Sequence, residues 1–138
     1  MSNTKPIGVA YEDQDIVGAD RIYSSGELGY TSAGQGTVTQ LTDKSTAVTL
    51  NKAAGQITMN NAALAGNTAV SFTMNNSFIS TNDVLIVNVG AGAVADPAAY
   101  TVYVSNLAAG TVLITVRNLS ATSRSEALVL NFALIHCL

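Results

Sequence analysis

The sequence predicts an all-β protein: an antiparallel β-sandwich or jelly roll of about eight strands, preceded by an extended N-terminal arm. Three observations support this prediction. Short runs of alternating apolar and polar residues recur along the chain, and clusters of Gly, Asn, Asp and Ser separate these runs. No stretch of about 11 residues or more combines helical apolar spacing with capping residues, so we expect little helix.

The chain of 138 residues fits a single domain, which we divide into an arm at residues 1–35 and a β-sandwich at residues 36–138. Val70, Phe72 and Met74 show the clearest strand alternation, because polar residues separate them. A turn at residues 106–110 joins two strands as a β-hairpin. In chain order, the predicted strands are residues 37–41, 46–51, 56–60, 70–75, 84–89, 100–105, 112–116 and 128–134.

Residues 84–89 differ from the other predicted strands because nearly all of them are apolar. Such a run is typical of a central strand that is covered on both faces. We therefore place Val84 and Ile86 in the core with the inward residues of the other strands. The predicted core consists of Val48, Leu50, Ile57, Met59, Phe72, Val84, Ile86, Val102, Ile114, Leu130 and Phe132.

The first 35 residues have no regular period, since glycines interrupt a mixture of acidic and apolar residues. One interpretation is a frayed terminus, which is where disorder concentrates. The apolar content favours instead an extended arm that becomes ordered on a partner, because a solvated tail would be more polar. The candidate partner-binding residues of this arm are Ile7, Val9, Tyr11, Ile16, Val17, Ile22 and Tyr23.

Charged residues make up only 11% of the sequence, against about 25% in typical soluble domains. Much of the surface must then be Ser, Thr, Asn and Ala, which suits a face packed against another chain, so we interpret the domain as an assembly part. The net charge of −3 provides no basic field for nucleic acid or an anionic membrane. The apolar runs are too short to span a bilayer and no secretion signal is visible, which predicts a soluble protein made in the cytoplasm.

Residues that usually perform catalysis or bind metals are scarce and scattered. His136 and Cys137 are the only imidazole and thiol, and neighbours in a strand point to opposite faces, so the two do not pair within one chain. The one arrangement of His136 that could bind a metal is a homotrimer that brings three copies of this side chain together around its threefold axis. Glu12, Asp13 and Asp15 resemble a calcium site only weakly, because the twelve-residue loop of an EF-hand is missing. We predict no enzyme activity, no cofactor and no metal.

Several sequence blocks form a recognisable pattern from Gly29 to Ala133. The longest reads GTVTQLTDKSTAVTLNK at residues 36–52, and the next reads GQITMNNAAL at residues 55–64. Shorter blocks follow at residues 70–73, 83–88, 114–120 and 125–133. This pattern resembles small virion proteins of tailed bacteriophages. The resemblance implies a virion structural component, either a capsid decoration or cement protein or a part of a head or tail fibre, and it brings no catalytic residues.

Composition and resemblance together predict a non-enzymatic capsid cement or decoration protein on the virion surface, synthesised in the host cytoplasm. Such a protein binds the assembled major capsid protein and stabilises the shell by bridging capsomers. We expect a homotrimer, with a dimer as second choice, and no nucleic-acid or membrane partner. The alternatives are a trimeric head- or tail-fibre module that binds a receptor, and a carbohydrate-binding β-sandwich, although a chain without Trp lacks the strongest sugar-stacking side chain.

Overall fold

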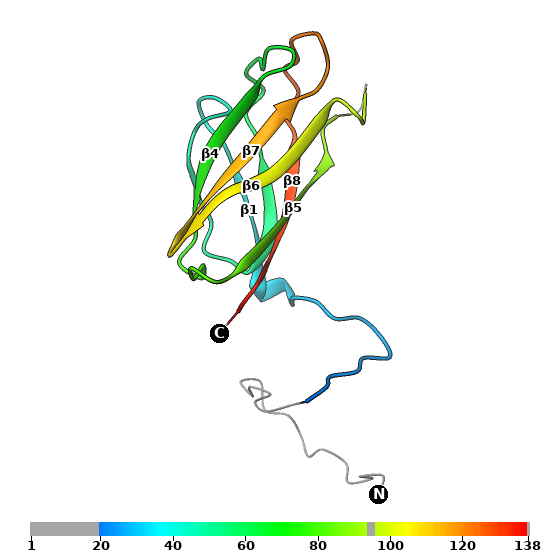
Figure 1. Cartoon of the computed structure of the whole chain (residues 1–138), viewed down its shortest axis with the longest axis vertical. Helices are drawn as coiled ribbons and strands as arrows, with labels where there is room; N and C mark the ends of the chain where they lie inside the picture. The colour runs from blue at the N-terminus through cyan, green and yellow to red at the C-terminus, as the bar shows by residue number, and fades with distance from the viewer. Residues whose placement is uncertain (1–19, 94–95, 138) are drawn as a thin grey trace, which may run out of the picture.

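The computed structural model describes residues 20–93 and 96–137, which form a sandwich of two four-stranded sheets (Figure 1). Sheet A has the strand order β1-β3-β8-β5, and sheet B has the order β2-β4-β7-β6. The predicted all-β sandwich of eight strands is confirmed, and each predicted strand overlaps an observed one. The elements are η1 (Ser32–Gly34), β1 (Gln35–Thr39), β2 (Val48–Thr49), β3 (Ala54–Thr58), β4 (Ala69–Asn75), β5 (Val84–Ala91), β6 (Tyr100–Ala108), β7 (Thr111–Asn118) and β8 (Val129–Ile135).

The pairing is not wholly antiparallel, which corrects the predicted topology. β1 pairs with β3 in parallel, and β2 pairs with β4 in parallel, whereas the other neighbours are antiparallel. Parallel neighbours need a crossover of a dozen or more residues, and here the crossover of each pair is a strand of the opposite sheet. Parallel pairs do not belong to an antiparallel jelly roll, so the jelly roll is not confirmed.

One apolar core lies between the two sheets, and most of the predicted core residues belong to it. Leu50 and Val102 are half-buried at its margin. Met74, Leu128 and Leu134, which the prediction left out, are fully buried as well. The predicted residues that are buried are Val48, Ile57, Met59, Phe72, Ile114, Leu130 and Phe132.

The prediction was wrong for Val84 and Ile86, which are about half exposed. Their strand β5 lies at an edge of sheet A and is not a central strand. Leu85, Val87 and Val89 are the side chains of β5 that pack on the core. Successive residues of a strand point to opposite faces, and in this run both sets are apolar. Alternation alone therefore does not identify which set is buried.

Buried polar side chains hold the connections together at one end of the sandwich. Gln40 Nε2 donates to the carbonyl oxygens of Lys44 (3.1 Å) and Thr46 (2.9 Å), and Gln40 Oε1 accepts from the Asn60 N–H (3.1 Å). Lys44 is itself buried, and its ammonium group donates to the carbonyl oxygens of Asn60 and Glu126. Burial lowers the Lys44 pKa, and the Glu126 carboxylate partly opposes that shift. These bonds satisfy backbone groups that would otherwise be buried without partners.

Two buried asparagines stabilise the loops that follow β4 and β7. Asn118 Nδ2 donates to the carbonyl oxygens of Leu64 (3.0 Å) and Thr122 (2.9 Å), which ties together two loops at the same end. Asn76 Nδ2 donates to the carbonyl oxygen of Lys52 (2.7 Å) at the opposite end. Each asparagine follows the last core-facing residues of its strand, so it fixes the direction in which the chain crosses to the other sheet.

Replacing Phe132 with Ala should lower the free energy of unfolding by roughly 3–5 kcal/mol, because a buried aromatic ring is lost and a cavity remains. Phe78→Ala is the matched control, since the Phe78 side chain is 46% exposed and its loss should cost much less. Denaturant unfolding at one fixed protein concentration measures both variants. Equal losses for the two variants would contradict the core described above.

Asn118→Ala should destabilise the protein by about 1–3 kcal/mol, because it removes the bonds that the buried amide donates to Leu64, Ala65 and Thr122 and the bond that its oxygen accepts from the Ser120 N–H. Asn75→Ala is the control, since its side-chain amide makes only a long contact of 3.5 Å with Thr49 Oγ1, and it should change stability by less than about 0.5 kcal/mol. Thermal unfolding of the two variants beside the parent protein tests the difference. A stable Asn118→Ala protein would show that water or another group replaces the amide.

Candidate functional site

Charged residues lie almost wholly outside the strands of the described part of the chain. No residue of β1, β3, β5 or β8 is charged, and Arg117 is the single charged residue in the strands of sheet B. The remaining charges of the described residues are in the arm and in the loops at the two ends of the sandwich. Both broad faces of the protein are therefore nearly uncharged, as the low charge content suggested.

The outer face of sheet A belongs to the sheet whose strands have no charged residue, and we take it as the candidate functional site. The register aligns its side chains in rows that run across the four strands. Its members share an outward direction, opposite to that of the core residues. They are Gln35, Thr37 and Thr39 of β1, Ala54, Gln56 and Thr58 of β3, Val129, Asn131, Ala133 and Ile135 of β8, and Val84, Ile86, Asn88 and Gly90 of β5.

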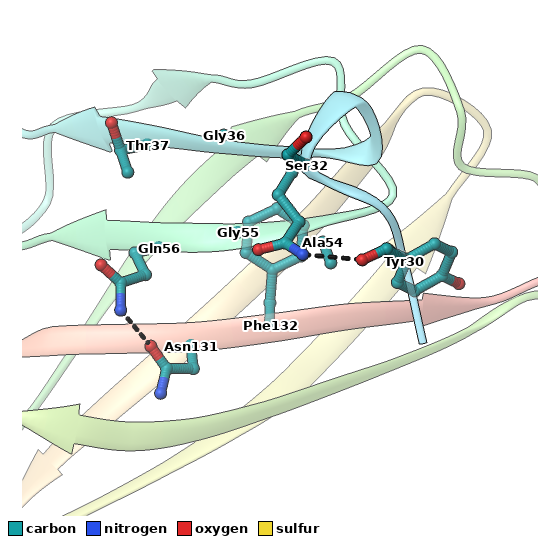
Figure 2. A pocket seen from close by; sticks show the side chains of 10 residues that line it. Tyr30, Ser32, Gly36, Thr37, Ala54, Gly55, Gln56, Asn131 and Phe132 are labelled. Carbon is teal, nitrogen blue, oxygen red and sulfur yellow. Dashed lines mark hydrogen bonds between the residues drawn. The ribbon is translucent and has the colours of Figure 1, made fainter. Parts of the chain in front are cut away.

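One row of this face consists of polar uncharged side chains. Thr37 is in register with Gln56, Gln56 with Asn131, and Asn131 with Asn88. Gln56 Nε2 donates to Asn131 Oδ1 at 3.1 Å (Figure 2). The Asn131 amide also lies over Gly90, where a Cβ atom would be 2.4 Å from Asn131 Nδ2. Any other residue at position 90 would therefore displace the Asn131 side chain.

An open hollow of about 710 Å³ lies beside this row, over β1, β3 and β8. Gly36 and Gly55 form part of its floor, and a Cβ atom on Gly55 would be 2.2 Å from the Gly36 carbonyl oxygen. Tyr30 closes one end: its hydroxyl donates to the Leu134 carbonyl oxygen, and Gln35 Nε2 donates to the Tyr30 carbonyl oxygen at 2.8 Å. The lining offers amides, hydroxyls and the exposed ring of Tyr30, groups that bind by hydrogen bonds and apolar contact, whereas the ring of Phe132 is buried.

An apolar corner occupies the end of the face next to the C-terminus. Val84 and Ile135 are paired across β5 and β8, and Ile86 lies opposite Ala133 in the next row. Val84, Ile86 and Ile135 are each about half exposed. Side chains of this kind in adjacent positions form a small apolar patch, and such patches often mark interaction sites.

The arm residues predicted to bind a partner fall into two groups. Ile7, Val9, Tyr11, Ile16 and Val17 lie outside the described residues, as do Glu12, Asp13 and Asp15. Ile22 and Tyr23 are described, and they are 67% and 84% exposed. Residues 20–30 lie away from the sandwich and lead towards it, and the chain joins the sheet beside the C-terminal end of β8 (Figure 1). The structure thus attaches the arm to the edge of the outer face of sheet A through Tyr30.

His136 and Cys137 share a partner that the sequence interpretation missed. One oxygen of the Asp83 carboxylate lies 2.9 Å from His136 Nδ1 and accepts the Cys137 N–H at 3.0 Å, and the other accepts the Ser80 N–H at 2.7 Å. The Asp83 side chain is fully buried, and the Cys137 side chain is exposed as a free thiol. In the described residues, no three His, Cys, Asp or Glu side chains lie together as a metal site. Asp83 therefore anchors the C-terminal end of sheet A.

A second charged cluster lies at the far end of the sandwich. Arg124 forms ion pairs with Asp96 (2.9 Å) and Glu126 (3.0 Å), and the Tyr100 hydroxyl donates to Glu126 Oε2 at 2.5 Å. Burial and the neighbouring Glu126 carboxylate raise the Tyr100 pKa, so this hydroxyl stays protonated at neutral pH. These ion pairs and the Tyr100 hydrogen bond fasten the loop after β7 to the start of β6, which is a structural role.

Comparison with known proteins gives no relative from which a function can be transferred. No family model matches the chain, and neither a curated protein nor a solved structure matches it. Within residues 20–93 and 96–137, none of the helices is long and apolar enough to span a membrane. The functional argument therefore depends on the surfaces described above.

Acidification should release the C-terminal end from Asp83. Burial alone would raise the Asp83 pKa, but the N–H groups of Ser80 and Cys137 and the His136 ring lower it overall from the usual 3.8. Because the pKa is lower in the folded protein, the stabilisation is present above about pH 4 and is lost as the pH falls through the folded value. The protection of the Cys137 amide against exchange, relative to its intrinsic rate at each pH and followed from pH 6 downwards, should fall in that range.

The control for this titration is Asp83→Asn, which retains one oxygen acceptor but does not ionise. In this variant the exchange rate at Cys137, after correction for the intrinsic pH dependence, should no longer change with pH below neutrality. An unchanged titration in the variant would assign the effect to a different carboxylate.

Proposed function

We propose that this protein is a non-enzymatic capsid cement or decoration protein of a tailed bacteriophage. It binds the assembled shell of major capsid protein, stabilises the shell by bridging capsomers, and resides on the virion surface. It self-associates as a homotrimer, with a dimer as the second choice. The observation that carries the proposal is the pairing of an uncharged sheet face with the exposed Ile22 and Tyr23 of an arm that joins this sheet at Tyr30.

The physical basis of this function is linkage between binding and stability. A protein that binds only the assembled shell lowers the free energy of that state and not of the free subunits. Charges that stay at the ends of the sandwich leave its flat faces free to pack without like-charge repulsion or ion desolvation. The exposed Ile22 and Tyr23 side chains give the arm apolar area to bury in a groove of the shell.

A second candidate is a trimeric head- or tail-fibre module that binds a receptor. One observation favours it: the hollow beside Tyr30 combines an aromatic ring with neutral amides and hydroxyls, which are groups that bind uncharged sugars. Adsorption of the isolated protein to host cells, blocked by Gln56→Ala in the hollow, would favour this candidate over the capsid role.

Deletion of residues 1–23 should leave the folded oligomer intact and abolish binding to shells. The reason is that the proposed arm buries its apolar side chains only on the shell. This burial must exceed the ordering cost of about 1–2 kcal/mol per residue, so the arm supplies the net affinity and its deletion removes it. Co-sedimentation with purified shells that lack the protein measures the occupancy. A deletion variant that still decorates shells at parental occupancy would show that the arm is not the anchor.

Substitutions within the described arm give a finer test of the same proposal. The double variant Ile22→Ser with Tyr23→Ser should weaken shell binding by about tenfold or more, as expected for loss of interface anchors. Leu41→Ser is the matched control, because Leu41 is equally apolar and 86% exposed in a loop of the sandwich away from the arm. Parental binding by the control and loss by the arm variant is the expected pair of results.

A further inference from the structure

We infer that the outer face of sheet A is the surface by which copies of this chain associate with one another. The inference rests on the self-association proposed above and names its location. Sheet B offers a second broad face, so the argument must explain why sheet A is the better candidate. Three properties separate the two faces: charge, the state of the polar groups, and the exposed apolar area.

The first property is the charge of each face, because the symmetry of an oligomer brings identical residues together. Near the axis of a cyclic assembly, twofold or threefold, each residue lies beside copies of itself. A charged residue there would face like charges, which is unfavourable when they are desolvated. No strand of sheet A has a charged residue, whereas the outer face of sheet B carries Arg117 on β7. Sheet A can therefore pack against itself at any point of its face.

The second property is whether the polar side chains of each face already have hydrogen-bond partners. On sheet B, the Thr115 hydroxyl bonds to the Ser71 hydroxyl at 2.7 Å and to the Ser105 hydroxyl at 2.8 Å, so these groups largely satisfy one another. On sheet A, the bond between Gln56 and Asn131 uses one donor and one acceptor. Within residues 20–93 and 96–137, Gln56 Oε1 and Asn131 Nδ2 have no side-chain or backbone partner, so they can bond to another chain. A surface with both a free acceptor and a free donor is complementary to a copy of itself.

The apolar corner provides the third property. Val84, Ile86 and Ile135 are adjacent and about half exposed on sheet A. On the outer face of sheet B, Tyr103 of β6 is 48% exposed, and Leu113 of β7 is partly buried. Association through sheet A would cover three large apolar side chains that are about half exposed, against one on sheet B.

The size of the face predicts the strength of the association. Four strands about 4.8 Å apart, which have five to eight residues each at about 3.3 Å per residue, give a planar footprint of roughly 400 Å². A standard interface buries about 800 Å² per partner. The association of the free protein should therefore be reversible, and it should be measured at concentrations of about 1–100 µM.

The test is sedimentation velocity of the full chain and two matched variants over that concentration range. Ile86→Lys places a charge on the outer face of sheet A, and Tyr103→Lys places the same charge on sheet B at a position of similar exposure, 53% against 48%. Ile86→Lys should weaken self-association by about tenfold or more, and Tyr103→Lys should change it by less than about twofold. Unfolding curves confirm that both variants are folded.

A cross-linking experiment tests the same face without introducing a charge. In a Cys137→Ser background, Gln56→Cys near the centre of the sheet A face should form an intermolecular disulfide under mild oxidation, and Thr73→Cys on the outer face of sheet B should not. Parental association by Ile86→Lys, or equal cross-linking by both cysteine variants, would overturn the inference.

The outcomes also separate this inference from the proposed function. A parental chain that stays monomeric across the range refutes the proposed self-association, and with it the inference. A parental oligomer that Ile86→Lys does not disrupt refutes only the assignment to sheet A. An Ile86→Lys oligomer that no longer binds shells would show that the face contacts the shell protein and not a second copy, which also overturns the inference.

Discussion

The architecture depends on satisfying the backbone polar groups of connections that pass repeatedly from one sheet to the other. Buried N–H and C=O groups without partners would cost too much for such a small core. Polar side chains solve the problem at each end: Gln40 and Lys44 at one, Asn76 and Asp83 at the other. In the described residues, every buried side-chain nitrogen and oxygen has a hydrogen-bond partner. The sandwich is thus fastened by its loops as well as by its apolar core.

This arrangement explains where the few charges are found. Lys44, Asp83 and the Arg124 cluster all bind loop backbone or one another, so they are used within the fold and are not spread over its faces. The sheets are left with Ser, Thr, Asn, Gln and apolar side chains. A low charge content is therefore a consequence of assigning charges to the loops, and the uncharged faces that result are the surfaces on which an assembly protein would pack.

The sequence predicted the strands well and their arrangement less well. Alternation located β4, because Val70, Phe72 and Met74 are separated by polar residues. It could not place Val84 and Ile86, since both faces of β5 are apolar and only the neighbouring strand determines which is covered. The parallel pairs were missed because register is a long-range property. The low charge content predicted an assembly surface, but the row from Gln56 to Asn131 appears only when β3 and β8 are aligned.

The end of β8 is where the separate features of the molecule meet. On one side the Tyr30 hydroxyl binds the Leu134 carbonyl oxygen and fixes the exit of the arm. Just beyond the strand, Asp83 holds Cys137 through its backbone N–H, next to the apolar corner of the outer face. The arm and the face are therefore attached to the same strand end. Under the function and the self-association that we propose, the shell-binding arm and the face between copies are neighbouring parts of sheet A. Such an arrangement would allow one protein to contact the shell and its own copies at the same time.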